Sequence, residues 1–175
     1  MRYTKILATI LLTAAIGHAQ TRAHAEAGFT INLEAAPAVA LPLFGPIREA
    51  EWAHGWSPMM LYTGGDRQPV GSVFTTTDNS KDVVWVVTRF DEHALEVDYA
   101  QVLPSVWAGE ILIRLKAVGK NRTEATVTYR RTALSLEADE GVEAFGRHFP
   151  RQCEHWENAI NQRLRSMAGQ YGRQN

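Results

Sequence analysis

An amphipathic segment near the end of the chain places the strongest constraint on its fold. Between Asp139 and Met167, apolar residues recur at steps of three or four, the spacing of one face of an α-helix. The stripe consists of Val142, Phe145, Phe149, Cys153, Trp156, Ile160, Leu164 and Met167. Side chains of this size need a broad apolar surface to cover them, which a preceding sheet can supply. The helix then either closes a filled core or roofs a cavity.

Pro150 interrupts this helical pattern. Proline lacks a backbone N–H and its ring clashes with the preceding turn, so we expect a kink or break near Phe149. Because the stripe stays in phase on both sides, the prediction is one bent helix. Cys153 is the only cysteine, so no intrachain disulfide can form. Its place on the stripe favours a buried apolar role over a nucleophilic one.

Seven runs with strand-like composition or alternation precede the helix. They lie at 28–34, 59–62, 71–77, 82–90, 94–103, 107–118 and 123–131. Short turns between most of them predict an antiparallel meander with one wet face. Two short helices are expected after the first strand, one starting at Pro37 and one over Ile47 to Trp52. The sequence therefore predicts an α+β domain with about seven strands and a long C-terminal helix.

The first 25 residues have the pattern of a secretory signal peptide. Arg2 and Lys5 precede an uncharged apolar run of 11 residues, Ile6–Ile16, which is too short to span a membrane. Small residues then allow cleavage after Ala19 or after Ala25. The features are those of the general secretion route, so we expect export to the periplasm or the outside of the cell.

The mature domain is expected over residues 26–170, with a frayed polar tail at 171–175. Cleavage after Ala25 would leave 15 Lys and Arg against 19 Asp and Glu, a net charge of −4. This balance argues against nucleic-acid binding, which needs a basic surface, and against adhesion to anionic lipid. We expect no stable membrane insertion after cleavage. The oligomeric state is left open.

Residues 43–58, LFGPIREAEWAHGWSP, resemble the pattern Leu-Phe-x-Pro-x-x-Glu-x-x-Trp-x-x-Gly-Trp-x-Pro of a bacterial branch of the SRPBCC, or START-like, superfamily. Residues 71–75, 85–87 and 129–134 match that branch in order. The resemblance implies a helix-grip fold, in which a curved antiparallel sheet grips one long C-terminal helix. Members commonly hold an apolar cavity between sheet and helix. Their ligands include sterols, phospholipids, polyketides and plant hormones, and some members are cyclases or dehydratases. The fold alone does not determine the reaction.

On this fold, a ligand would lie between the concave sheet face and the final helix. The predicted cavity walls are Phe74, Trp85, Val97, Tyr99, Ile113, Val127, Tyr129, Phe145, Phe149 and Trp156. Inward tyrosines would need partners for their hydroxyl groups, and a polar group of the ligand could be one.

Three charged or titratable residues are candidates for orienting a ligand. Glu49 and His54 could perform acid–base chemistry at the cavity mouth; alternatively, Glu49 bonds a backbone amide or Arg48 and has a structural role. Arg131 would anchor a carboxylate if it points inward, or form a surface salt bridge. His148 and His155 are about 10 Å apart along a helix, too far to share a metal ion. No cofactor-binding motif is present, and none is expected.

The leading hypothesis is an exported protein that binds a lipophilic small molecule. A second hypothesis is a cyclase or dehydratase acting on an aromatic or polyketide-like substrate through Glu49 and His54. A third is a structural domain with a filled core. The presence of a cavity and the direction of these two side chains discriminate among them.

Overall fold

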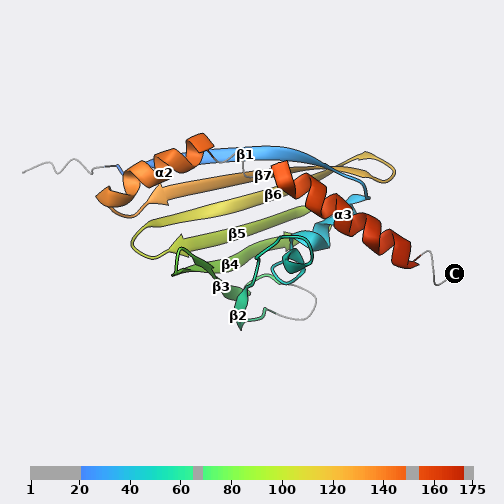
Figure 1. Cartoon of the computed structure of the whole chain (residues 1–175), viewed down its shortest axis with the longest axis horizontal. Coiled ribbons are helices and arrows are strands. Elements are labelled where there is room, and N and C mark those ends of the chain that lie inside the picture. The colour runs from blue at the N-terminus through green and yellow to red at the C-terminus, as the bar shows by residue number, and fades with distance from the viewer. Residues whose placement is uncertain (1–20, 65–68, 149–153, 172–175) are drawn as a thin grey trace, which may run out of the picture.

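One seven-stranded sheet with helices on its inner face forms the body of the protein (Figure 1). The computed structural model describes residues 21–64, 69–148 and 154–171. The elements are β1 (His24–Leu33), α1 (Pro37–Ala40), the 3₁₀-helices η1 (Leu41–Phe44) and η2 (Arg48–Glu51), β2 (Met59–Tyr62), β3 (Val73–Asp78), β4 (Lys81–Asp91), β5 (Glu96–Leu103), β6 (Trp107–Gly119), β7 (Arg122–Ala133), α2 (Leu136–His148) and α3 (Glu154–Tyr171). The predicted α+β class and antiparallel sheet are confirmed.

The strand order explains how the short helices come to lie over the sheet. The order is β1-β7-β6-β5-β4-β3-β2, and all neighbouring pairs are antiparallel. β3 to β7 form successive hairpins; Asn79 and Ser80 have φ of 47° and 65°, as the tight β3–β4 turn requires. The first strand instead pairs with the last, so β1 and β2 are opposite edges. The segment carrying α1, η1 and η2 must therefore cross from one edge to the other.

Alternation along the strands separates an inner from an outer face. On β7, for example, Val127 is fully buried and its neighbour Thr126 is exposed. Inner-face residues form two apolar clusters. One includes Ile160 and Leu164 of α3, and the other includes Val142 of α2. Both helices consequently cover the same face of the sheet.

Two helices are described in the region where a single bent helix was predicted. α2 ends at His148 and α3 begins at Glu154, and the two run in different directions (Figure 1). Phe149, Pro150 and Cys153, with the expected kink, lie outside the described residues.

Side-chain hydrogen bonds fix α3 to the end of β1. The Asn161 side chain accepts from the Glu34 N–H at 2.8 Å and donates to the Asn32 carbonyl at 2.9 Å. Glu157 accepts from the Asn32 N–H at 2.8 Å. These bonds terminate β1 and set the position of α3. In the described part of the chain, no helix is both long enough and apolar enough to traverse a bilayer.

The first strand starts earlier than its alternation suggested, at His24. Just before it, the Ala23 N–H donates to Asp139 at 2.8 Å, and Arg22 forms a 3.4 Å ion pair with the same carboxylate. These contacts join the start of β1 to α2. Cleavage after Ala25 would remove them, whereas cleavage at the other predicted site would leave them intact.

Candidate functional site

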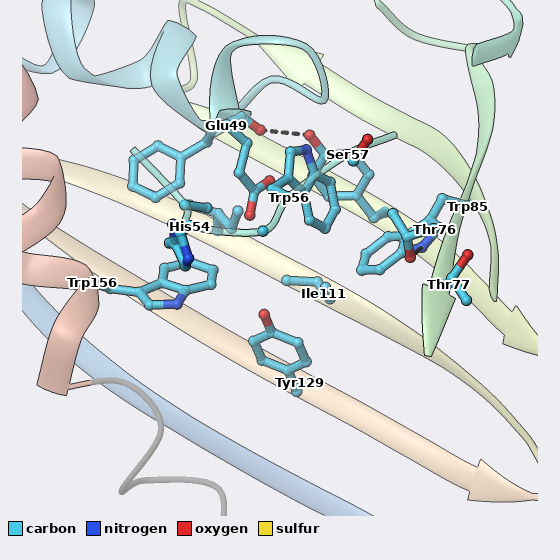
Figure 2. Close-up of a pocket in the computed structure, with 15 residues that line it drawn as sticks. Glu49, His54, Trp56, Ser57, Thr76, Thr77, Trp85, Ile111, Tyr129 and Trp156 are labelled. Carbon is cyan, nitrogen blue, oxygen red and sulfur yellow. Dashed lines mark hydrogen bonds between the residues drawn. The ribbon is translucent and has the colours of Figure 1, made fainter. Parts of the chain in front are cut away.

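A cavity of about 510 Å³ opens between the inner face of the sheet and the short-helix segment (Figure 2). Its size lies within the range of small-molecule sites, about 300–1,000 Å³. The lining residues are Phe44, Glu49, Ala53, His54, Gly55, Trp56, Ser57, Thr76, Thr77, Trp85, Tyr99, Ile111, Ile113, Tyr129 and Trp156. The sheet supplies the floor, η2 and the turn after it supply one wall, and α3 supplies Trp156.

Half of the ten predicted wall residues line this cavity. They are Trp85, Tyr99, Ile113, Tyr129 and Trp156. Phe74, Val97 and Val127 are fully buried behind the wall, in the core cluster of α3, so they do not line it. Phe145 packs on Tyr129 with 6.2 Å between ring centroids, beside the cavity rather than in it. Phe149 lies outside the described residues.

Three residues were assigned to the wall incorrectly because alternation identifies the inner face but not what covers it. Phe74 shows the difference. Its ring stacks on Trp85 at 5.6 Å and 10°, and it meets the edge of Trp56 at 6.0 Å. Phe74 therefore supports the two indoles that face the cavity. Such aromatic contacts hold the wall in place.

The indole N–H groups of three tryptophans are bound to the protein itself. Trp52 donates to the Leu43 carbonyl at 2.8 Å, and Trp56 donates to the Pro46 carbonyl at 2.7 Å. Trp85 donates to Thr76 Oγ1 at 2.9 Å. These bonds orient the rings, so Trp56 and Trp85 present apolar surface to the cavity rather than a donor.

The Tyr99 hydroxyl is also satisfied within the protein. It donates to the carbonyl of Phe44, which connects the floor of the cavity to η1. A polar group of the ligand was one predicted partner of this hydroxyl; in the structure the partner is a backbone carbonyl of the protein. Burial, together with the nearby Glu49 carboxylate, raises the pKa of Tyr99 well above its ordinary value. Tyr99 therefore remains a neutral structural element of the floor.

Glu49 points into the cavity from η2, with the Tyr129 hydroxyl reaching into the same space from the opposite side (Figure 2). The predicted alternative, a pairing of Glu49 with Arg48, is wrong. Arg48 instead binds Glu51 at 2.9 Å on the outside of η2, and Arg163 of α3 binds the same Glu51 at 2.7 Å. Among the described residues, the Glu49 carboxyl group makes no hydrogen bond or ion pair.

Burial raises the pKa of Glu49 to about 8. The charged form loses its hydration inside the protein and gains no compensating donor there. The residue keeps some accessible surface, but that surface faces the cavity, so the carboxyl is still enclosed by protein atoms. At neutral pH it is mostly protonated, and it can donate a hydrogen bond to a ligand or release a proton.

His54 lies at the rim of the same cavity. It is exposed, like Gly55 and Ser57 of the same turn, and Gly55 adopts φ +80°, which favours glycine. Glu49 and His54 are thus brought to one cavity, the first inside and the second at the opening. The arrangement offers a buried acid and a solvent-accessible imidazole to a bound molecule.

Arg131 points inward, as alternation along β7 predicted, and Arg130 points outward. Arg130 binds Glu26 at 2.8 Å, whereas Arg131 forms no ion pair with any described residue. Its guanidinium group lies between the rings of Trp107 and Phe145, 4.0 Å and 3.9 Å from their centroids. The predicted alternative of a surface salt bridge is therefore not found there. Burial lowers the pKa of Arg131 to about 10, which leaves it charged at neutral pH.

Within the described residues, no group of three His, Cys, Asp or Glu side chains could hold a metal ion. His148 stands at the end of α2 and His155 in α3.

Several solved structures have an architecture similar to that of this chain. Norcoclaurine synthase from Thalictrum flavum superposes with a TM-score of 0.64 at 12% identity, over 93% of this chain and 98% of that one. The Zhui aromatase/cyclase from Streptomyces sp. R1128 gives 0.60 at 15% identity, over 82% and 96%. Ara h 8.0201 gives 0.56 at 14%, over 82% and 99%. This chain has the helix-grip fold. No family model matches its sequence, and no curated protein does.

Several site residues escaped prediction from the sequence. Ile111 alternates inward like Ile113 but is not among the predicted wall residues, and Thr76 and Thr77 give no signal beyond strand propensity. Phe44 and Trp56 lie in the segment that resembled the superfamily pattern, which marks the fold rather than a wall. Their contribution depends on where the crossing segment comes to rest on the sheet.

Proposed function

We propose that the protein binds a small lipophilic molecule, of lipid, sterol or polyketide type, in the cavity over its sheet. The observation that carries this proposal is the 510 Å³ space bounded by aromatic side chains and a buried carboxyl group. Apolar burial would supply most of the affinity, at about 25 cal/mol per Å² before ordering costs. A filled structural core, the third hypothesis, is not supported by a space of this size.

The protonated Glu49 also favours an uncharged ligand group at its side of the cavity. A neutral carboxyl group donates a hydrogen bond to a ligand carbonyl or hydroxyl without placing a charge in an apolar site. Trp156 offers a second donor, because its indole N–H has no partner among the described residues. A lipophilic molecule with one or two oxygen atoms fits this combination.

The proposal includes export from the cytoplasm. Its support is the charged n-region, the short apolar run and the small-residue cleavage sites in the first 25 residues. An exported carrier would meet its ligand in the periplasm or outside the cell. Fractionation of a producing bacterium, followed by immunoblotting, would detect the mature chain in the periplasm or medium; accumulation in the cytoplasm would contradict this part.

Native mass spectrometry tests binding directly. The protein is purified from an exporting host, weighed intact, and then extracted with solvent. A co-purifying mass of lipid or polyketide size supports the proposal. A bare protein that also fails to take up neutral fluorescent lipid and sterol probes refutes it.

A matched pair of variants on β6 links binding to this cavity. Ile111 faces the cavity and its neighbour Leu112 faces the other side of the sheet. Ile111→Phe reduces the free volume and should weaken uptake of the probe. Leu112→Phe adds the same bulk outside and should leave uptake unchanged. Equal effects of the two substitutions would place binding elsewhere.

A second candidate function, a cyclase or dehydratase, is favoured by one specific observation. Glu49 has a pKa near 8 inside the cavity, with His54 at its opening, and acids tuned towards neutrality serve in proton transfer. Two proteins of similar fold are named as a synthase and an aromatase/cyclase. If this chain catalyses dehydration, Glu49→Gln should retain a bound species heavier than the wild-type species by one water. Identical extracted masses favour the carrier.

A further inference from the structure

Two inner-face side chains near the cavity have buried donors without partners among the described residues. They are the Nε of Arg131 on β7 and the Nε2 of Gln101 on β5. Gln101 is only 1% exposed, although an amide in a protein core normally has its hydrogen bonds satisfied. Both groups can therefore donate a hydrogen bond to a polar partner from outside the protein.

The strand register brings these two residues to either side of a glycine. Arg131 pairs with Gly109 of β6, and Gly109 pairs with Gln101. Adjacent strands are about 4.8 Å apart. Only one strand, β6, therefore lies between Arg131 and Gln101. A Cβ atom on Gly109 would lie 2.1 Å from the Arg130 carbonyl and 3.2 Å from Arg131 Cγ. Glycine therefore makes room for the arginine stem between the two polar groups.

Aromatic rings hold the guanidinium group of Arg131 in a fixed plane. Its Cζ atom lies over the rings of both Trp107 and Phe145, 4.0 Å and 3.9 Å from their centroids. Cation–π contacts of this kind engage the faces only, and all the N–H donors of arginine point outward in the plane of the group. The edge is thus left to bind an acceptor, in an orientation set before the acceptor arrives.

The charge on Arg131 is not neutralised by an ion pair among the described residues. Asp78, exposed at the end of β3, acts on it only through space. The adjacent Arg130, by contrast, has Glu26 at 2.8 Å and Glu110 at 3.7 Å. A half-buried cation without a counterion is unfavourable, and an anion from outside the protein would relieve it.

The pair of residues adjoins the cavity. Tyr129, two positions before Arg131 on the same face of β7, lines the cavity, and so does Trp85, which pairs with Gln101. A ligand whose apolar body lies over Tyr129 can therefore extend its polar end towards the row formed by Arg131, Gly109 and Gln101.

We propose that Arg131 and Gln101 bind the carboxylate head of the ligand, at the end of the cavity away from Glu49's carboxyl group. This inference rests on the proposed function. One guanidinium charge matches one carboxylate charge, and its planar edge suits two oxygen atoms side by side. The ligand would then be a lipophilic carboxylic acid, either a fatty acid or an aromatic acid.

Matched acid and alcohol pairs test the anchor at pH 7. The mature protein is loaded with a neutral fluorescent probe, which dodecanoic acid and dodecanol then displace; naphthoic acid and naphthylmethanol form the aromatic pair. In the pair that binds, the wild type should prefer the acid by about tenfold or more. The pair that binds shows whether the ligand is a fatty acid or an aromatic acid.

Variants then assign the preference to the two residues. Arg131→Gln should reduce the acid preference to within about twofold, with alcohol affinity unchanged. Arg130→Gln, on the outer face, should preserve the preference. Gln101→Leu should weaken acid binding while leaving the protein at least as stable, because it removes an unpartnered buried amide.

Each outcome decides between the proposals. Equal displacement by acid and alcohol in the wild type overturns the anchor and leaves the cavity proposal standing. If none of the four compounds displaces the probe, both the anchor proposal and the cavity proposal are overturned. Should Arg131→Gln fail to fold, the wild-type preference and Gln101→Leu still decide, and an acid preference unaffected by Gln101→Leu removes Gln101 from the site.

Discussion

Substitution of Glu49 by glutamine should make the protein more stable at neutral pH, although it alters a residue of the site. Glutamine has nearly the shape of a protonated glutamic acid but cannot ionise. The wild-type carboxyl group is buried, has no hydrogen bond among the described residues, and has a pKa raised to about 8 by desolvation. The substitution therefore removes the cost of ionising a buried group.

The magnitude follows from the difference between the folded and unfolded pKa. The ordinary value is 4.5 and the folded value is about 8. Because the folded state holds the proton more tightly, the cost to stability is absent below pH 4.5, grows as the pH rises, and is complete above pH 8. Each pKa unit corresponds to about 1.4 kcal/mol, which gives about 3 kcal/mol at pH 7 and about 5 kcal/mol above pH 8.

Urea unfolding of the wild type and Glu49→Gln, monitored by tryptophan fluorescence from pH 4 to pH 9, measures this effect. The difference between the two proteins at each pH cancels the titration of all other groups. An unchanged m-value shows that both unfold to the same extent. The variant should equal the wild type near pH 4 and exceed it increasingly up to pH 8.

Glu51 supplies a control of opposite sign, two residues away in the same 3₁₀-helix. Its pKa is lowered, chiefly by the hydrogen bond from Arg48 and also by Arg163. Such a group adds stability above its unfolded pKa and loses it as the pH falls. Glu51→Gln should thus be less stable than the wild type at pH 7 and converge with it in acid. A Glu49→Gln difference that stays flat from pH 5 to pH 8 would refute the buried neutral acid.

Three further predictions concern the framework. Asn161→Ala should lower the free energy of unfolding by about 1–2 kcal/mol in urea, because it leaves the part-buried Glu34 N–H and Asn32 carbonyl without their side-chain partner; no change would show that the bonds are replaced by water. Gly109→Ala should cost about 2 kcal/mol or more through its 2.1 Å backbone contact, and a wild-type melting temperature would contradict that contact. N-terminal sequencing of exported protein should begin at Gln20; Glu26 would show that the contacts to Asp139 are dispensable.

The exact wall of the cavity shows where prediction from the sequence succeeded and where it stopped. Tyr99, Ile113 and Tyr129 were placed on the inner face by alternation, which is a local property of a strand. Val97 and Val127 had the same alternation but are fully buried behind the wall. The difference is made by what covers each position, and that covering comes from segments distant in the chain.

The sequence by itself determined the strands, the short helices and the face that each strand buries. The local order of apolar side chains shows the periods of two and of about 3.6 residues that are typical of strands and helices. The strand β2, for example, was predicted at Met59–Tyr62 from the sequence alone. The inward direction of Arg131 followed from the same period. The resemblance of the crossing segment to a known pattern added the helix-grip arrangement.

The tertiary structure alone decided how these elements meet. The pairing of β1 with β7 sends the crossing segment over the sheet, and this turns Glu49 inward while Arg48 binds Glu51 outside. The register of three strands aligns Arg131, Gly109 and Gln101. Ionisation and partner choice depend on which groups approach through space, because desolvation and hydrogen bonding act over a few ångströms regardless of separation in sequence. That information is absent from any local pattern.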